Sequence, residues 1–470
     1  MKKNMLLVLI ICTILILSGC ASASEPDEAP DTNTLPPVQS DDTPPPAPPS
    51  DTLPPVRVDD IAQLIRLDEA APLISTGSGQ SMSATAVARG ANDFAFRLSA
   101  ALLEDIGYEN FVVSPYSVWM PLAALVNATR EPLRPALIEV LGAAGISPDN
   151  INRAASRMLF DLTNERARRE NWASRGGSEE SPLHIANAIF VDYNWPLRKE
   201  FAQTFADFYR GSAMNVDFSS KAAVDAVNQW ASDNTSGLIN EVVQEFDPDA
   251  VAAIVNAIYF SGSWSRAFDP DNTERGTFYS PAYTREVYFM QQSGVFTYFE
   301  DEHIQAVDLA FTGDSGMMII LPKDGDAVGF MSTMTNECFN QIQRSSVIGD
   351  GRLELPRFSI ENTLGNLKDA LIAMGIPLFD EMAAPLTGGL IYDDGLPVWL
   401  GDAIQVAMIE VDEEGATAAA VTAMMVHVRS GLLPQTTFEM ICNTPFAFIL
   451  YSNIRDGGRQ ILFMGVVNQP

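Results

Sequence analysis

The chain has 470 residues and a formal net charge of −31, with 47% hydrophobic and 19% charged residues. This hydrophobic content is enough to bury a sizeable core, so most of the chain is expected to fold. The acidic composition argues against a nucleic-acid partner, because contacts to phosphates need a basic face.

The first 20 residues have the pattern of an export signal. Lys2 and Lys3 precede an uncharged apolar run from Met5 to Leu17, which is too short to span a membrane as a helix. The sequence Leu-Ser-Gly-Cys then ends at Cys20 and resembles the bacterial lipobox, in which the cysteine is lipidated and becomes the mature N-terminus. We therefore predict a lipoprotein signal over 1–20 and an extracytoplasmic domain, anchored by lipid to the bacterial cell membrane or cell surface. An ordinary secretory signal with an incidental Cys20 is the alternative.

Residues 21–85 begin with a stretch dominated by Pro, Asp, Thr and Ser and are assigned to an extended acidic tether. Beyond it, residues 86–470 contain no second linker and no internal repeat. This part of the chain is therefore expected to form one domain.

The periodicity of apolar residues predicts helices mainly in the first half of this domain and strands mainly in the second. Asn92 is a candidate cap for the first helix. This order indicates an α+β fold with antiparallel or mixed sheets. The predicted helices are 92–105, 114–129, 196–209 and 221–235, and the predicted strands are 182–192, 250–264, 317–322, 352–360, 403–414, 446–451 and 460–468.

No constellation for catalysis is present. His184, His303 and His427 do not lie in a nucleophile-elbow pattern, and neither a Gly-rich phosphate loop nor metal-ligand spacing is found. We therefore expect neither an enzyme nor a bound metal or cofactor. Cys338 and Cys442 are expected as free thiols, with a disulfide between them as the alternative.

One stretch, residues 410–433, does not fit ordinary surface sequence. Two acids and Gly415 precede a run, 416–428, that contains no Asp, Glu, Lys or Arg, and the run ends at Arg429. A helix and a flexible linker are two interpretations. In a third, the small side chains belong to a segment that can slide between two strands, with Gly415 as its hinge. Arg429 would then be an exposed bait for a trypsin-like protease, whose specificity pocket is acidic.

Glu413 to Ala423 fits the pattern Glu-Glu-Gly-Xaa-Xaa-Ala-Ala-Ala-Xaa-Thr-Ala and resembles the hinge and reactive-centre loop of a serpin. Other serpin-like landmarks follow in the family's order and cover about residues 90–470. They are "VSPYS", "NAIYFSGSWSRAFDPDNTERGTF", "LPKDG", "LELPRFSIE", "MGIPLFD" and "PFAFIL…GRQILFMGVVNQP". The resemblance implies a helix-rich N-terminal half, three β-sheets and an exposed loop that can insert into the main sheet.

The resemblance also implies a function and a set of site residues. The chain would be a monomeric suicide-substrate inhibitor of a trypsin-like serine endopeptidase, cleaved at its reactive bond and then trapping the protease by loop insertion. The implied residues are Arg429 and Ser430 at the reactive bond; Glu413, Glu414, Gly415, Ala416, Ala418 and Ala420 at the hinge; and Ser114, Ser117, Asn256, Trp264 and Gln405 at the shutter and breach.

Two positions depart from the family's usual pattern. Ala416 stands where members commonly have Thr or Ser, and Gln405 stands where many have a shutter histidine. A non-inhibitory surface serpin and an inhibitor of a cysteine protease remain as alternatives.

Overall fold

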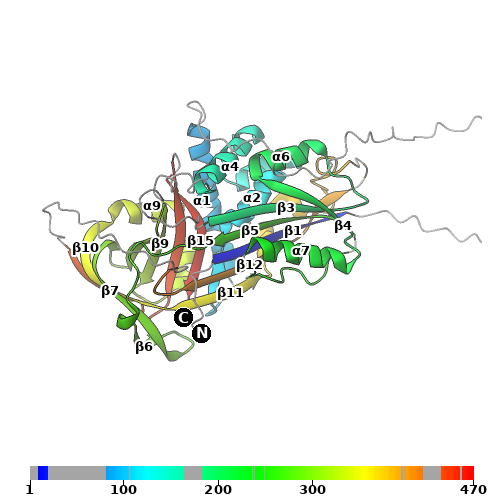
Figure 1. Ribbon diagram of the computed structural model, residues 1–470. Coiled ribbons are helices and arrows are strands. Elements are labelled where there is room, and N and C mark those ends of the chain that lie inside the picture. Colours follow the sequence, from blue (N-terminus) through cyan, green and yellow to red (C-terminus); the bar gives the residue numbers. More distant parts are fainter. Residues whose placement is uncertain are drawn as a thin grey trace, which may run out of the picture.

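The computed structural model describes residues 9–19, 81–104, 106–163, 183–235, 237, 239–247, 249–392, 395, 397–415, 436–455 and 458–470. Within these residues the strands connect into two hydrogen-bonded sheets, and helices pack against both (Figure 1). The mixture of helices and several β-strands confirms the predicted α+β class.

The smaller sheet has six strands in the order β11-β12-β1-β5-β3-β4. Their bounds are Phe358–Leu364 for β11, Val398–Val411 for β12, Leu9–Gly19 for β1, Ala250–Phe260 for β5, Leu183–Asp192 for β3 and Gly211–Val216 for β4. The strand β1 is antiparallel to both of its neighbours, so β5 and β12 run parallel to each other on either side of it.

The larger sheet has nine strands, eight in the order β13-β10-β7-β8-β9-β14-β15-β2 and a ninth, β6, on β7. The bounds are Thr436–Ile441 (β13), Val347–Pro356 (β10), Thr284–Glu300 (β7), Ile304–Ala310 (β8), Ser315–Pro322 (β9), Phe446–Ile454 (β14), Gly458–Val467 (β15), Phe111–Val113 (β2) and Glu274–Tyr279 (β6). The pairing of Thr297–Glu300 of β7 with β8 joins two groups of strands that would otherwise be separate sheets.

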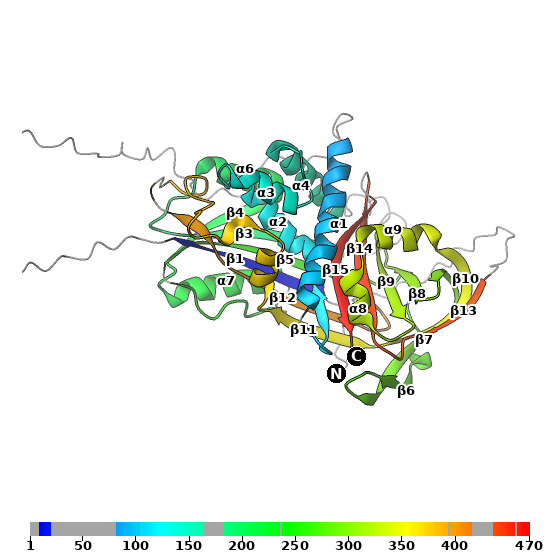
Figure 2. The same cartoon turned by 180° about the vertical axis from the view of Figure 1, so that it is seen from behind.

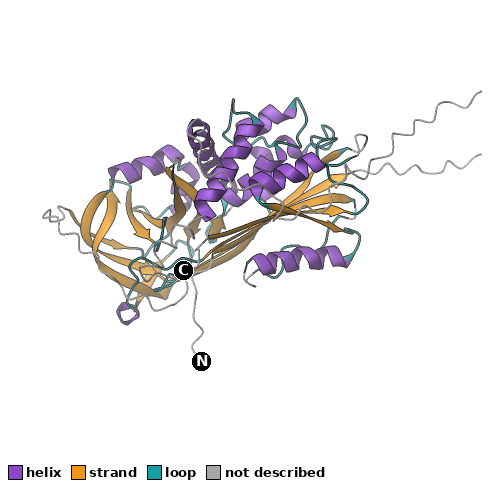
Figure 3. Cartoon of the chain, turned by 45° about the horizontal axis from the view of Figure 1, so that its top comes forward, coloured by secondary structure: helices purple, strands orange, loops and turns teal. Residues whose placement is uncertain are grey.

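The helices are α1 (Ser81–Leu103), α2 (Pro115–Leu125), α3 (Leu133–Val140), α4 (Pro148–Thr163), α6 (Lys199–Tyr209), α7 (Lys221–Asn234), α8 (Ala327–Thr333), α9 (Asn336–Ser345) and α10 (Leu367–Ala373). Short 3-10 turns cover Pro270–Asn272 and Pro377–Phe379. Seen from behind and from above, most of the first-half helices cover one face of the six-stranded sheet, while α7 covers the other (Figures 2 and 3).

This arrangement explains why β5 is apolar on both faces. Ala253, Val255 and Ala257 pack in the cluster that contains the buried residues of α7. Ile254 and Ile258 alternate with them and belong to the main core on the opposite face. A strand covered on both faces reads as a continuous apolar run, which is the pattern of this segment.

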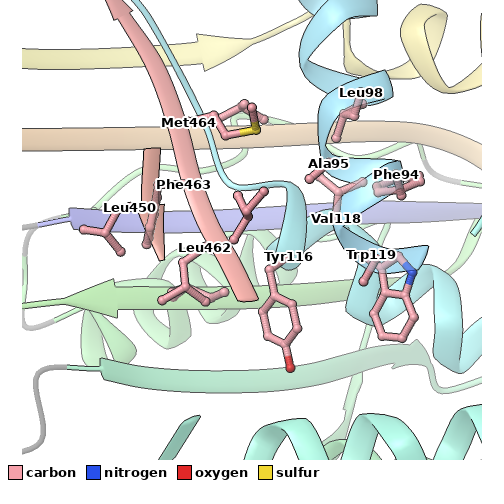
Figure 4. Close-up of a cluster of buried hydrophobic side chains, with 14 of the residues drawn as sticks. Phe94, Ala95, Leu98, Tyr116, Val118, Trp119, Leu450, Leu462, Phe463 and Met464 are labelled. Atoms are coloured by element: carbon pink, nitrogen blue, oxygen red, sulfur yellow. The ribbon is translucent and has the colours of Figure 1, made fainter. Parts of the chain in front are cut away.

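The main core joins α1 and α2 to β14 and β15. Tyr116, Val118 and Trp119 of α2 are fully buried beside Leu462 and Met464 of β15 (Figure 4). The indole nitrogen of Trp119 donates to the Leu141 carbonyl oxygen at 3.1 Å. This packing fixes α2, which carries the predicted site residue Ser117 and is capped by Ser114, between the two sheets.

Two sequence predictions about element ends were wrong. The first helix starts at Ser81, so Asn92 lies inside α1 and does not cap it. Its buried side chain instead accepts the N–H of Ile461 at 3.0 Å and donates to the Arg459 carbonyl oxygen at 2.7 Å. The predicted strand 352–360 is two strands that break at Arg357, because Pro356 cannot donate a ladder hydrogen bond.

Residues 9–19, which the sequence assigns to the export signal, form the central strand β1 (blue in Figure 1). Among the described residues, no helix has the length and apolar character needed to cross a membrane. Cleavage and lipidation at Cys20 stay predictions, since Cys20 lies outside the described residues.

Candidate functional site

The chain turns sharply where β12 ends. The Asp412 carboxylate accepts the backbone N–H of Glu414 at 3.0 Å, and Gly415 follows with φ +82. A Cβ on Gly415 would lie 2.5 Å from the backbone nitrogen of Trp264. Both the left-handed backbone and the lack of space therefore require glycine at this predicted hinge.

Trp264 holds the hinge against the sheet. Its backbone nitrogen donates to the Glu414 carbonyl oxygen at 3.2 Å, and its indole nitrogen donates to the Asp412 carbonyl oxygen at 3.0 Å. The ring is buried and stacks on Phe311, with centroids 4.3 Å apart. The structure thus brings together three residues that the sequence analysis assigned separately to hinge and breach, namely Glu414, Gly415 and Trp264.

Glu413 carries a buried carboxylate, with only 5% of the residue exposed. Arg357, at the break between β10 and β11, donates from Nε to both carboxylate oxygens at 2.8 and 2.9 Å, and its Nη2 lies 2.6 Å from Oε1. The Thr273 hydroxyl also donates to Oε1. Bidentate pairing of this kind fixes the position of a carboxylate as well as compensating for its burial. Sequence analysis did not identify Arg357; a lone arginine directly after Pro356 is the only signal that it gave.

Asp412 lies beside this pair in an acidic surrounding. Burial raises the pKa of its carboxyl to about 6, with the neighbouring Glu413, Glu414 and Glu410 adding to the rise and the Glu414 N–H opposing it. Burial also raises the pKa of Glu410. The carboxyl groups of Asp412 and Glu410 therefore favour the protonated form more than exposed carboxyl groups do.

The predicted shutter residues meet where the N-terminal end of α2 contacts β5 and β12 of the six-stranded sheet. Ser114 caps α2, and its backbone N–H donates to Oε1 of Gln405 at 3.0 Å, while Nε2 of Gln405 donates to the Ser114 carbonyl oxygen at 3.1 Å. The Ser114 hydroxyl donates to the Leu462 carbonyl oxygen at 2.7 Å. The amide of Gln405 can donate and accept at once, so it pairs with both the N–H and the carbonyl oxygen of Ser114.

A second chain of hydrogen bonds crosses from α2 to the far strands. The Ser117 hydroxyl bonds to Oδ1 of Asn256 on β5, and Nδ2 of Asn256 donates to Oδ1 of Asn187 on β3 at 2.7 Å. Nδ2 of Asn187 then donates to the Tyr209 carbonyl oxygen at 2.6 Å. Sequence analysis missed Asn187, although "IANAIF" and "IVNAIY" each place one asparagine in an apolar strand.

Both shutter groups flank the strand β1. In the sheet register, Thr13 pairs with Asn256 of β5 on one side and with Gln405 of β12 on the other. The sheet therefore has a slot between β5 and β12 that accepts an antiparallel strand, and the hinge lies at one end of it. We call this position, between Ala250–Phe260 and Val398–Val411, the central slot.

The remaining predicted residues of the site lie outside the described residues. These are Ala416, Ala418, Ala420, Arg429, Ser430 and Cys20. Cys338 and Cys442 are free thiols, as predicted, and burial raises the pKa of Cys442. Across the described part of the chain, no three His, Cys, Asp or Glu residues are grouped as metal ligands would be.

A family model described as serpin (serine protease inhibitor) matches residues 89–470. Human neuroserpin is 30% identical over 383 residues, which cover 77% of this chain and 86% of neuroserpin. Antichymotrypsin-2 of Bombyx mori is 31% identical over 389 residues, covering 80% and 96% of the two chains. An uncharacterized serpin-like protein of Thermococcus kodakarensis is 29% identical, covering 82% and 86%.

The fold is also similar to a solved structure. The crystal structure of a thermophilic serpin, tengpin, in the native state matches with a TM-score of 0.70 at 22% identity, covering 87% of this chain and all of tengpin. At this level of identity the similarity shows the fold alone.

Proposed function

Because this chain belongs to the serpin family, whose model spans 89–470, we propose that it is a suicide-substrate inhibitor of a serine endopeptidase. The reactive bond is Arg429–Ser430. The target is trypsin-like, since Arg429 is the only Lys or Arg between residues 369 and 454 and such enzymes bind arginine in an acidic pocket.

The central slot is the observation that carries this proposal. Its two walls, β5 and β12, run parallel, and an antiparallel strand of 11 residues fits between them. The chain that leaves β12 through the hinge and turns back would run in this same antiparallel direction. An inserted strand of that length extends about 35 Å, enough to carry an attached protease far along the domain.

The register at the hinge gives further support. Gly415 forms an antiparallel bridge with Ser263. If the same register continues along β5, Thr422 arrives opposite Asn256, the shutter residue that hydrogen-bonds to Ser117. A threonine can donate and accept, so it suits a polar position inside an apolar sheet.

The proposed chemistry needs only the protease's own nucleophile. Its serine oxygen bonds to the carbonyl carbon of Arg429, and the bond from that carbon to the nitrogen of Ser430 breaks. The nitrogen takes a proton and leaves as an amine, so an ester links Arg429 to the protease. Insertion of the freed loop into the central slot then distorts the protease before water cleaves the ester.

We also propose that Cys20 carries the lipid anchor and that the domain is displayed outside the cytoplasm on the acidic segment before α1, which begins at Ser81. The Leu-Ser-Gly-Cys sequence supports this assignment. Growth of the exporting cells with labelled fatty acid tests it: the parent chain should carry the label, and a Cys20→Ser variant should not. Equal labelling of both would contradict lipidation at Cys20.

Two substitutions test the inhibitory steps separately in a chain that begins at Ala21. Arg429→Gln should abolish cleavage by trypsin, because it removes the side chain that the specificity pocket binds. Ala416→Glu should leave cleavage intact but lower the yield of covalent complex at least tenfold, because insertion would bury an unpaired carboxylate. Ala416→Ser is the matched control, since its small side chain inserts without a charge.

Two results would contradict the proposal. If Ala416→Glu traps trypsin as well as Ala416→Ser does, insertion is not the trapping step. If the parent chain is cleaved without trapping trypsin, the same gel with a cysteine protease distinguishes that target class from a non-inhibitory role.

A further inference from the structure

The central slot is filled by the chain's own N-terminal segment. Backbone pairs run from Leu9 to Ser18 against β5 and from Ile10 to Gly19 against β12. In Figure 1 this strand lies between β5 and β12 along the length of the sheet. A strand paired on both sides has no free edge, so it contributes hydrogen bonds to both neighbours.

The N-terminal segment matches the polar position of the slot as well as its direction. It contains no charged residue from Leu9 to Gly19, and its single threonine, Thr13, stands at the register position shared by Asn256 and Gln405. Thr422 would reach this same position if the register of the bridge between Gly415 and Ser263 continued along β5. Thr13 therefore takes the place that a threonine of the inserted loop would take.

We propose that residues 9–19 are an internal occupant of the central slot, and that a chain carrying them can be cleaved by its target but cannot trap it. The strand and the reactive loop cannot occupy the slot together. Removal of the N-terminal segment, as the predicted cleavage before Cys20 would do, then opens the slot for the loop. The occupancy rests on the sheet register, whereas its consequence for trapping rests on the proposed inhibitory function.

The N-terminal segment is part of the same chain as the slot that it fills. A strand tethered to the same chain binds at an effective concentration that reaches the millimolar range, so occupancy does not depend on protein concentration. Displacing it requires breaking a ladder on both sides before the loop can form its own. The loop is tethered to the same chain as well, so the need to break this existing ladder is what keeps it out of the slot until the segment is cut away.

The first test measures the occupancy alone, without a protease. The full chain carries Cys20→Ala so that it is not processed, and a second version adds Ile14→Pro in the middle of β1. Proline removes a ladder donor from a central strand. Ser24→Pro, beyond β1, is the matched control. Amide exchange should be at least a hundredfold faster in Ile14→Pro than in the control at those amides of Val255, Asn256, Gln405 and Val406 that face β1, which is one of each adjacent pair.

Equal exchange in the two proline variants would overturn the occupancy. A chain that begins at Ala21 gives a second route if Ile14→Pro does not fold, because the family match lies wholly within that chain. Adding a synthetic peptide of residues 9–19 should then slow exchange at the same amides, and no slowing would contradict the proposal.

The second test adds trypsin. The full chain should be cleaved with at least a tenfold lower yield of covalent complex than either the Ile14→Pro variant or the chain that begins at Ala21. Equal trapping by all three would show that the strand does not block insertion. This result would overturn the proposal that a chain carrying residues 9–19 cannot trap its target. If no version traps protease while the exchange difference persists, the proposed inhibitory function fails and the occupancy stands.

Discussion

Arg357→Ala tests the ion pair that holds the hinge. The substitution removes the guanidinium that binds both oxygens of the Glu413 carboxylate and leaves that carboxylate buried, with the Thr273 hydroxyl as a partner. We expect a loss of stability, because an uncompensated buried charge is costly.

The magnitude follows from the burial of the two partners. Removing one partner of a fully buried pair costs about 3–5 kcal/mol. Here Glu413 is buried to 6% side-chain exposure, but the side chain of Arg357 is 38% exposed, so water already screens part of the attraction. The Thr273 hydroxyl also remains. We therefore expect the free energy of unfolding to fall by about 2–3 kcal/mol.

Urea unfolding followed by tryptophan fluorescence measures this change. The matched control is Lys221→Ala, which breaks a Lys221–Asp225 pair of 2.7 Å whose side chains are 83% and 63% exposed. That pair should contribute less than about 0.5 kcal/mol. Glu413→Ala and the double variant complete a cycle, in which the double loss should be smaller than the sum of the single ones. Equal effects of Arg357→Ala and Lys221→Ala would show that the buried Arg357–Glu413 pair contributes no more to stability than an exposed pair.

Three further predictions concern the hinge and the shutter. Burial in the folded state raises the pKa of Asp412 to about 6, so the folded state binds a proton at this carboxyl more readily than the unfolded state does. The free energy of unfolding therefore falls as the pH rises from about 4 to about 6. Asp412→Asn should be more stable than the parent at pH 8, and equal urea midpoints at pH 8 would contradict this. Gly415→Ala should cost about 2 kcal/mol, seen as a lower urea midpoint, because φ is +82 and the Cβ would meet Trp264. Asn187→Ala should lower the free energy of unfolding by about 2–4 kcal/mol, because it leaves Nδ2 of Asn256 without its acceptor. A loss below about 0.5 kcal/mol in the same assay would show that the hydrogen bond between Asn256 and Asn187 is not structurally important.

The sequence predicted the parts of the fold whose signal is local. The apolar run 250–264 was correctly predicted as a strand, and β5 forms over Ala250–Phe260 of it. The special backbone position of Gly415 was also indicated, because the glycine and the small residues after it are adjacent in sequence, and its role as a hinge stays a prediction. Asn92 was misassigned as a cap, because its role depends on a contact with Ile461 that no local pattern shows.

The interactions missed at the site are those between residues distant in sequence. Arg357 and Glu413 are separated by 56 positions, and Asn187 and Asn256 by 69. Their side chains meet only because strands from different parts of the chain are neighbours in space. The pairing of residues 9–19 in the central slot was missed for another reason. An apolar segment of this length fits the pattern of an export signal and that of a buried strand equally well.

Trapping is tested by mixing the chain that begins at Ala21 with trypsin and separating the products on a denaturing gel. We expect a band at the summed mass of protease and inhibitor that survives boiling in detergent, with a released fragment that begins at Ser430 by mass spectrometry. Complete cleavage after Arg429 with trypsin left fully active would contradict the proposal that this loop traps a trypsin-like protease.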